Sequence, residues 1–378
     1  MDSSGRAGAP ILLQDAPVQA MTGGEAAPSP RMDSPLLEVA AERNGLPPLT
    51  TFTRRIGRTP LVEVQLRMAE QWRPMLLKLE GHNPGGSIKD RTAYSLVQSL
   101  ERQRPLEPAA SIVESTSGNL GTALAAICRA RGYRFTAVVD PKISSYTLDV
   151  LHRLHARVEQ VVETDPTGGY LLTRLARVRE LLEEDPASRW TNQYGNPANP
   201  RAHFEMTGPE LLRPLARPPA AVFVAVSTGG TLAGVGRYLK AVSPTTVVVG
   251  VDVAGSLVFD DRPGPRAITG IGSSRKSDFL TPEVYDDHVL VQEDEAIAAC
   301  HALSGLVGLH LGASSGAVVA AAARFVRRYA VRGTAICLCP DDGRKYHDTI
   351  YESAWLAARG IRLDSGLRAL AFDDVIGA

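Results

Sequence analysis

The sequence predicts an α/β fold of two domains, each with three layers: a mostly parallel sheet and helices on both of its faces. Three observations lead to this prediction. Short apolar runs alternate with helical patterns from Leu49 onward, which is typical of βαβ units. These runs form two sets along the chain, so two sheets with a cleft between them are expected. The 378 residues, 44% of them hydrophobic, are enough for two sizeable cores.

The predicted elements follow the chain in two sets. The first set has a strand at Ile112 and Val113, a helix at about 120–131, a strand at 135–139, a helix around 147–155 and a strand at 158–162. The second set has a strand at 220–226, a helix at 231–241, a strand at 246–253, helices starting near Glu293 and at Ser315, and a strand at 334–338. Before both sets, residues 1–48 are rich in Ala, Gly, Pro and Ser, which predicts a mostly flexible extension.

Composition excludes several classes of function. The 41 acidic residues balance 41 basic ones, so no overall charge favours nucleic acid or an anionic membrane. No apolar run reaches the roughly 20 residues that span a bilayer, and the N-terminus lacks a signal-peptide pattern. A cytoplasmic protein that acts on small molecules is therefore expected. No metal site is predicted, because the cysteines lack metal-type spacing and are expected to be buried free thiols; they are Cys128, Cys300, Cys337 and Cys339.

Lys89 is the strongest candidate for a catalytic residue. It lies in the stretch 83–91, NPGGSIKDR, whose glycines let backbone approach a ligand and whose Ser87 is placed to cap the following helix. The chain has only six lysines among its 41 basic residues, so a lysine here favours a role that needs an amine. A desolvated lysine can lose its proton and form a Schiff base, whereas arginine cannot. A helix N-terminus with a surface lysine is the alternative.

Two further strand-to-helix loops have the composition of anion sites. Residues 114–119, ESTSGN, bring N–H groups and hydroxyls to a helix N-terminus, where a substrate carboxylate fits and where Asn119 can donate to a phenolate-like oxygen. Residues 227–231, STGGT, have the composition of a phosphate cradle. No lysine follows as in a P-loop, so a single phosphate monoester is favoured over a nucleotide triphosphate. The alternative for residues 114–119 is plain capping of the helix, and the alternative for residues 227–231 is a tight structural turn.

A neutral hydroxyl precedes the last predicted helix, in the stretch 312–316, GASSG. There a serine can meet the ring nitrogen of a cofactor. A carboxylate partner would keep a pyridinium protonated, whereas a serine leaves the ring closer to neutral, which suits the elimination of a leaving group from Cβ. Capping of the helix by Ser315 is compatible with this role.

Taken together, and in their order along the chain, these motifs resemble the fold-type II pyridoxal-phosphate enzymes related to cysteine synthase and cystathionine β-synthase. The resemblance covers about residues 50–355 and rests on the stretches 57–62, 83–91, 116–119, 192–194, 196–200, 227–231, 270–272 and 314–316. It implies a tryptophan synthase β-like fold and a homodimer. It also implies a larger cofactor-binding domain of residues 49–90 and 195–378, and a smaller mobile domain of residues 91–194.

The resemblance further implies roles for individual residues. Lys89 would form the Schiff base with pyridoxal 5'-phosphate and act on the Cα proton, while Asn119 would contact the phenolic oxygen and Ser314 the pyridine nitrogen. The phosphate would be held by Ser227, Thr228, Gly229, Gly230 and Thr231. The substrate carboxylate would be held by Thr116, Ser117, Asn119 and Gln193, with Gly270 near the amino group.

Three longer stretches narrow the resemblance within the family. Residues 139–144, 168–174 and 270–275 are similar to those of enzymes that join O-phospho-L-serine to L-glutamate through α-aminoacrylate, in the biosynthesis of 2,3-diaminopropionate for siderophores. The function implied is therefore a β-replacement that releases phosphate. Arg275 is the candidate for gripping this phosphate, because a guanidinium can bind phosphate through two parallel hydrogen bonds.

Two alternatives stay open at this point. A cysteine synthase or a cystathionine β-synthase-like enzyme would use the same chemistry with a thiol nucleophile. Leu120 and Tyr194 depart from the pattern of sulfhydrylases, which commonly have threonine and phenylalanine there, and this puts sulfide specificity in doubt. A non-catalytic relative is a remote alternative, since its expected mark would be the loss of Lys89.

Overall fold

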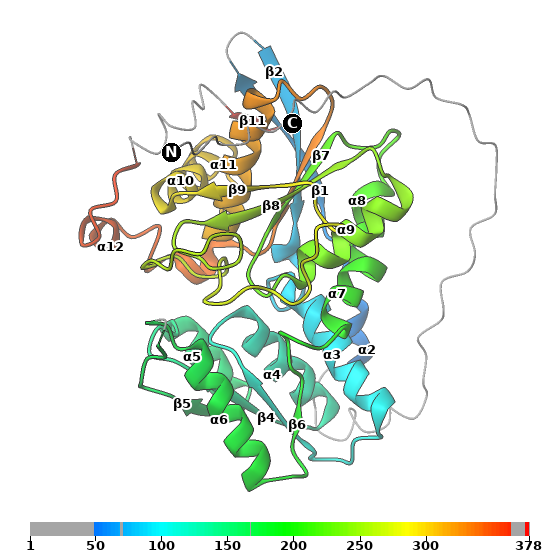
Figure 1. Ribbon diagram of the computed structural model, residues 1–378, viewed down its shortest axis with the longest axis vertical. Helices are drawn as coiled ribbons and strands as arrows, with labels where there is room; N and C mark the ends of the chain where they lie inside the picture. The colour runs from blue at the N-terminus through cyan, green and yellow to red at the C-terminus, as the bar shows by residue number, and fades with distance from the viewer. Residues whose placement is uncertain (1–48, 69–70, 167, 364–374, 378) are drawn as a thin grey trace, which may run out of the picture. The chain divides into compact units, whose positions relative to one another are not determined.

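The computed structural model describes residues 49–68, 71–166, 168–363 and 375–377, which form two sheets with helices on both faces (Figure 1). This confirms the predicted α/β class. The predicted extension, residues 1–48, lies outside the described residues. In the described part of the chain, no helix is both long enough and apolar enough to cross a membrane.

The larger sheet has seven strands in the order β11-β1-β2-β10-β7-β8-β9. These strands are β1 (Leu61–Met68), β2 (Gln71–Leu79), β7 (Ala221–Ala225), β8 (Val247–Val253), β9 (Asp287–Val291), β10 (Ala335–Cys339) and β11 (Val375–Gly377). β1 pairs antiparallel with both β2 and β11. All neighbours from β2 through β10, β7 and β8 to β9 are parallel.

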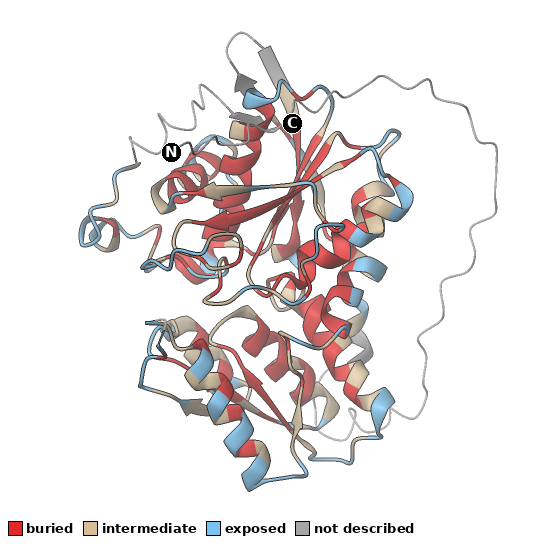
Figure 2. Cartoon of the chain, in the orientation of Figure 1, coloured by how far each residue is buried: buried red, intermediate tan, exposed pale blue. Residues whose placement is uncertain are grey.

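Helices cover both faces of this sheet. They are α7 (Ala198–Ala202), α8 (Gly208–Leu212), α9 (Gly230–Val242), α10 (Glu293–Val307) and α11 (Ala313–Arg328). Successive side chains of a strand point to opposite faces. On β7, Phe223 therefore packs into the core formed with α10 and α11, whereas Val222 packs into the core formed with α9. Figure 2 shows the central strands buried along much of their length, which explains their continuous apolar sequence.

The smaller sheet has four parallel strands in the order β5-β4-β3-β6. Its strands and helices are β3 (Ser111–Ser115), β4 (Arg134–Val139), β5 (Arg157–Gln160), β6 (Arg189–Trp190), α3 (Lys89–Gln103), α4 (Asn119–Arg131), α5 (Ser145–Arg153) and α6 (Leu171–Glu184). Ile112 packs with residues of α3, α4 and α5, while its neighbour Val113 packs with Val178 and Leu181 of α6. This sheet is also covered on both faces, as the predicted three layers require.

Most predicted elements are present, with their ends shifted by a few residues. The helix predicted to start at Ser315 begins at Ala313, and the strand predicted at 158–162 is β5. The hairpin of β1 and β2, helix α6 and the π-helix η3 (His203–Thr207) were not predicted. The remaining short helices are α2 (Leu49–Arg54), η2 (Glu80–His82), η4 (Gly343–Tyr346) and α12 (Ser353–Ala357).

The four cysteines are buried free thiols, as predicted. Cys337 and Cys339 lie on the same face of β10 and belong to the core shared with α11. Burial raises the pKa of Cys300 to about 12. Within the residues that the structure describes, no group of three or more His, Cys, Asp or Glu side chains is arranged to hold a metal ion.

Candidate active site

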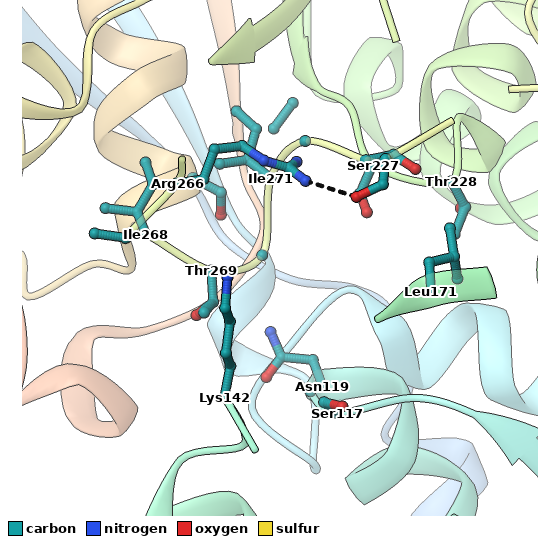
Figure 3. A pocket seen from close by; sticks show the side chains of 18 of the residues that line it. Ser117, Asn119, Lys142, Leu171, Ser227, Thr228, Arg266, Ile268, Thr269 and Ile271 are labelled. Atoms are coloured by element: carbon teal, nitrogen blue, oxygen red, sulfur yellow. Dashed lines mark hydrogen bonds between the residues drawn. The ribbon is translucent and has the colours of Figure 1, made fainter. Parts of the chain in front are cut away.

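A cavity of about 1230 Å³ lies between the two sheets, and residues of both line its walls. It opens beyond the carboxyl ends of β3, β7 and β10, which is where parallel sheets bind ligands. Figure 3 shows side chains from separate loops converging on it. The sequence-predicted residues that line the cavity are Lys89, Thr116, Ser117, Asn119, Gln193, Ser227, Thr228, Gly229, Thr231, Gly270 and Ser314.

Lys89 is the first residue of α3, and its side chain lies on the cavity wall. Ser87 accepts a hydrogen bond from the Lys89 amide at 3.3 Å, although the residue that caps α3 is Ile88. The residue keeps some accessible surface because it faces the cavity. Desolvation nevertheless lowers the pKa of the Lys89 amine to about 8, against an opposing attraction from Asp341. Near neutral pH this amine can therefore act as a base or a nucleophile.

Asn119, the first residue of α4, is held at both ends of its amide. Its Nδ2 donates to Asp341 Oδ2 at 2.7 Å, and its Oδ1 accepts from Lys345 Nζ at 2.6 Å. Tyr346 also donates to Asp341 Oδ2, at 2.6 Å. Burial raises the pKa of Asp341. The sequence reasoning missed these three residues, although their position directly after strand β10 was a signal that pointed to the cavity.

The loop between β3 and α4 presents hydroxyls at a helix N-terminus. Ser117 Oγ donates to Asp140 Oδ2 at 2.8 Å and accepts from Arg174 Nη1 at 2.9 Å. Thr116 Oγ1 accepts from the backbone of α4, and Gln193 Nε2 donates to the carbonyl of Ser115 at 2.7 Å. Thr116 takes the N–H of Gly121, while the N-cap residue Gly118 has no side chain, so the N–H groups of Asn119 and Leu120 remain available to an anion. The arrangement suits a carboxylate.

The loop between β7 and α9 is a glycine-dependent cradle. Gly229 has a φ of +87° and caps α9 without a side-chain hydrogen bond. A Cβ at Gly229 would lie 2.0 Å from Ser277 Oγ, and one at Gly230 would lie 2.1 Å from Asn199 Oδ1. Gly230 does not itself line the cavity. The uncapped N-terminus of α9 thus lies at the cavity wall, where its N–H groups suit a phosphate group.

Ser314 supplies the neutral hydroxyl predicted for a ring nitrogen. It is 1% exposed, it lines the cavity, and its Oγ has no hydrogen-bond partner among the described residues. A buried hydroxyl without a partner is costly unless a ligand satisfies it. Together with the amine of Lys89, the amide of Asn119 and the cradle at 227–231, this hydroxyl fits pyridoxal phosphate, which carries an aldehyde, a phenolic oxygen, a ring nitrogen and one phosphate.

Arg275 was predicted to grip the leaving phosphate, but it does not line the cavity. Its guanidinium donates to Asp278 at 2.6 Å and to the backbone of Lys276. Arg266, from the same loop between β8 and β9, does line the cavity. Desolvation lowers the pKa of Arg266. The sequence could not distinguish these two arginines, because the long loop folds back on itself.

Comparisons with known proteins agree with this geometry. The family model described as pyridoxal-phosphate dependent enzyme matches residues 52–341. A relative from Ralstonia nicotianae, named N-(2-amino-2-carboxyethyl)-L-glutamate synthase, is 43% identical over 302 residues, which cover 80% of this chain and 89% of the relative. A protein of the same name from Cupriavidus metallidurans is 41% identical, with 80% and 89% covered.

Solved structures are also similar to this chain in fold and sequence. O-ureido-L-serine synthase superimposes with a TM-score of 0.72 at 32% identity, over 81% of this chain and 98% of that one. An O-acetylserine dependent cystathionine β-synthase from Helicobacter pylori gives a TM-score of 0.72 at 29% identity, over 80% and 98%. The chain therefore belongs to the family of pyridoxal-phosphate dependent enzymes.

Proposed function

We propose that this enzyme replaces the phosphate of O-phospho-L-serine with the amino group of L-glutamate, giving N-(2-amino-2-carboxyethyl)-L-glutamate and phosphate. In this β-replacement the Cβ–O bond to phosphate breaks and a bond forms between Cβ and the glutamate nitrogen. The observation that carries the proposal is the buried amine of Lys89, facing a cavity lined by two anion-binding loops and by Ser314. The names of the two relatives from Ralstonia and Cupriavidus support the choice of substrates.

Lys89 moves the proton at Cα. When bound, pyridoxal phosphate supplies an electron sink that makes the Cα–H of an attached amino acid acidic. Lys89 Nζ, with its pKa lowered to about 8 by desolvation, takes this proton and later returns it. Ser314 Oγ would meet the ring nitrogen, Asn119 the phenolic oxygen, and the cradle at 227–231 the phosphate.

The first substrate is held at its carboxylate by the loop at 114–119. The first N–H groups of α4 and the hydroxyl of Thr116 would bind the carboxylate oxygens, and Gln193 closes the same part of the cavity. Ser117 would join them by turning its proton from Asp140 to the substrate. This fixes Cα in front of the Lys89 amine.

The leaving phosphate needs a cation close to the carboxylate loop, because Cβ is bonded to Cα. Arg174 meets this requirement better than Arg275. Arg174 lines the cavity, its Nη1 donates to Ser117, and its Nε lies 3.3 Å from Asp140 without forming a hydrogen bond. Tyr194 lines the cavity as well, and burial raises the pKa of its hydroxyl, so it stays a neutral donor.

A competition between nucleophiles tests the proposal. The enzyme is given O-phospho-L-serine or O-acetyl-L-serine, then glutamate, sulfide or homocysteine, and the products are identified by mass. We expect the glutamate adduct, with phosphoserine as the better donor. Cysteine or cystathionine without any glutamate adduct would establish the thiol-using alternative instead.

A pair of lysine variants provides the control. Lys89→Ala is expected to lower the rate by about 10²- to 10⁴-fold or more, because it removes both the amine and the base. Lys276→Ala removes a lysine that is 71% exposed and ion-paired with Asp261, and it should leave the rate unchanged. Equal rates in the two variants would contradict the role of Lys89.

The cellular setting is also part of the proposal. The product fits the start of 2,3-diaminopropionate biosynthesis for a siderophore, in the cytoplasm, with the enzyme working as a homodimer whose smaller part, residues 91–194, closes over substrate. What supports this setting is the resemblance described above and the names of the relatives. Light scattering with and without substrate would test both the dimer and its closure.

A further inference from the structure

The cavity is richer in cations than the first substrate requires. The lysines and arginines that line it are Lys89, Lys142, Arg174, Arg266, Lys345 and Arg359. Lys89 is the catalytic amine, Lys345 donates to Asn119, and Arg174 is ion-paired with Asp140. These three serve the cofactor and the first substrate.

The other three differ in what they contact. The guanidinium of Arg359 lies 4.1 Å from the centre of the Trp355 ring. Trp355 belongs to α12, and Arg359 is an exposed residue just after this helix. Arg266 and Lys142 have no carboxylate within 4.0 Å in the part of the chain that the structure describes. Two cationic side chains thus line the cavity without an anionic partner.

Arg266 is held in place by small groups. Its Nη2 donates to Ser274 Oγ at 3.2 Å. Figure 3 shows the guanidinium of Arg266 with a hydrogen bond drawn as a dashed line. Gly272, with a φ of +80°, makes room for it, because a Cβ there would lie 2.3 Å from Arg266 Nη1. The carboxylates that act most on its charge are Asp252 and then Glu293, but neither forms an ion pair with it within 4.0 Å: Asp252 accepts from the backbone amide of Val253, and Glu293 from those of Ala267 and Ile268. The guanidinium is therefore positioned, and within the described residues Ser274 is its one hydrogen-bond partner.

Lys142 approaches from the opposite wall. It follows β4 of the smaller sheet, and its amide is fixed by Asp140 Oδ1 at 2.9 Å. Figure 3 shows its side chain extending into the cavity toward Thr269, in the loop that also carries Arg266. The ammonium lies over the ring of Tyr170, 6.0 Å from its centre, and both residues line the cavity. The two cations therefore come from different sheets and face one cavity.

We propose that Arg266 and Lys142 bind the two carboxylates of a dicarboxylic amino acid, the second substrate, one from each wall of the cavity. This inference rests on the proposed function and adds the residues that select glutamate. A guanidinium with free N–H groups binds a carboxylate bidentately, and a lysine ammonium neutralises the second carboxylate as a point charge. Sulfide, with no carboxylate, would gain nothing from either residue.

The test separates the two halves of the reaction. Phosphate release from O-phospho-L-serine is measured without glutamate, and KM for glutamate is measured at saturating O-phospho-L-serine. Arg266→Ala and Lys142→Ala should each raise KM for glutamate by about 10- to 100-fold, the effect of losing one charge-assisted hydrogen bond. Phosphate release should change less than twofold, which also shows that the variants fold. Arg266→Lys should recover part of the loss.

Matched controls come from the same loop. Arg262→Ala and Lys276→Ala remove cations whose side chains are 90% and 71% exposed, and both should leave KM for glutamate unchanged. A second readout is selectivity: the wild type should prefer glutamate over glutamine, and Lys142→Ala and Arg266→Ala should reduce that preference.

Three outcomes would overturn the inference. If KM for glutamate stays within twofold in both variants, the second substrate binds elsewhere, although the β-replacement still stands. If Arg266→Ala abolishes phosphate release instead, Arg266 serves the leaving group. If the wild type releases phosphate but forms no glutamate adduct, the proposed function fails, and the inference fails with it.

Discussion

Asp341 acts on both the pKa of Lys89 and the orientation of Asn119. Its Oδ2 accepts from Asn119 and from Tyr346, while its Oδ1 has no partner among the described residues. Desolvation lowers the pKa of Lys89, and the Asp341 carboxylate opposes this shift. The carboxylate therefore keeps the amine basic enough to take a proton.

Replacing Asp341 by Asn tests this role. Without the carboxylate, the pKa of Lys89 should fall below its present value of about 8, because the attraction that stabilises the ammonium is lost. In cofactor-free protein, the rate at which a reagent modifies the Lys89 amine would be followed against pH, and its midpoint should move to lower pH. Asp278→Asn, which removes the exposed partner of Arg275, is the control. An unmoved midpoint would show that Asp341 acts only as a structural acceptor.

At the scale of single residues, the sequence identified side chains that belong to short motifs. Lys89, Asn119 and Ser314 each follow or begin a glycine-rich turn, and all three line the cavity. Asp341 and Lys345 were not identified, because their importance arises from contacts with Asn119 more than 200 positions away along the chain. Only the folded chain brings these partners together.

Among the elements, the cradle before α9 depends on glycine geometry. Gly229→Ala would combine a left-handed φ of +87° with a Cβ 2.0 Å from Ser277 Oγ. The loop would have to move, so we expect cofactor affinity to fall by about 10-fold or more, since a backbone strain of this kind costs about 1–3 kcal/mol. Equilibrium dialysis of pyridoxal phosphate measures this. Gly305→Ala in α10 meets no atom within 4 Å and should leave affinity unchanged, with a small gain in stability.

Helix α3 is anchored to the larger sheet by a buried ion-pair network. Arg91 contacts Glu80 at 2.7 Å and Glu210 at 2.8 Å, and Lys78 contacts Glu210 at 2.7 Å. Arg91 and Glu80 are fully buried. Burial alone would raise the pKa of Glu210, but hydrogen bonds from Arg91 and Lys78 lower it to about 2.

Arg91→Met should therefore destabilise the protein. The buried carboxylate of Glu80 loses its main partner and the partly buried Glu210 keeps only its ion pair with Lys78, and breaking a buried pair costs about 3–5 kcal/mol. Urea unfolding at pH 7 should show this loss. Because the pKa of Glu210 is depressed, its stabilising contribution is complete above its unfolded value of about 4.5 and is lost as pH falls toward 2. The difference in the free energy of unfolding between Arg91→Met and the wild type should therefore shrink as pH falls from about 4.5 toward 2. Arg201→Met, which breaks an exposed pair with Glu205, should cost less than about 1 kcal/mol.

The sequence predicted the helices and strands whose pattern of apolar residues is clear. Strands β7, β8 and β10 are buried on both faces and read as apolar runs. The β1–β2 hairpin was harder to predict, because Pro74 lies within β2 and proline is uncommon in strands. Arg91, the predicted first residue of a smaller domain, is bonded to the larger sheet, so sequence alone did not indicate where α3 is anchored.

At the scale of the whole described unit, an exposed side-chain bond joins the two walls of the cavity, in addition to the buried bonds of Asn119. Ser145 Oγ, at the start of α5, donates to Asp348 Oδ2 at 3.3 Å, just after η4. If the smaller part moves to admit substrate, as we propose, this contact must break. A Ser145→Cys, Asp348→Cys double variant should then lose most of its turnover on oxidation and regain it on reduction.

The measurement is the rate before and after a reductant is added. Each single variant serves as a control and should be insensitive to oxidation, because the four native thiols are buried. Full activity in the oxidised double variant would show that the cavity admits substrate without opening at this point.

The anchoring of α3 has a consequence for turnover. Lys89 begins the helix that Arg91 fastens to Glu80 and Glu210, and the phosphate cradle begins α9 on the same sheet. Arg91 thus ties the reactive amine to elements beside the larger sheet, which also carries the phosphate cradle. The rest of α3 packs in the core of the smaller sheet, to which the carboxylate loop belongs. If residues 91–194 move as we propose, each catalytic cycle clamps and releases an amino acid at the carboxylate loop while the cradle at 227–231 keeps its hold on the cofactor phosphate.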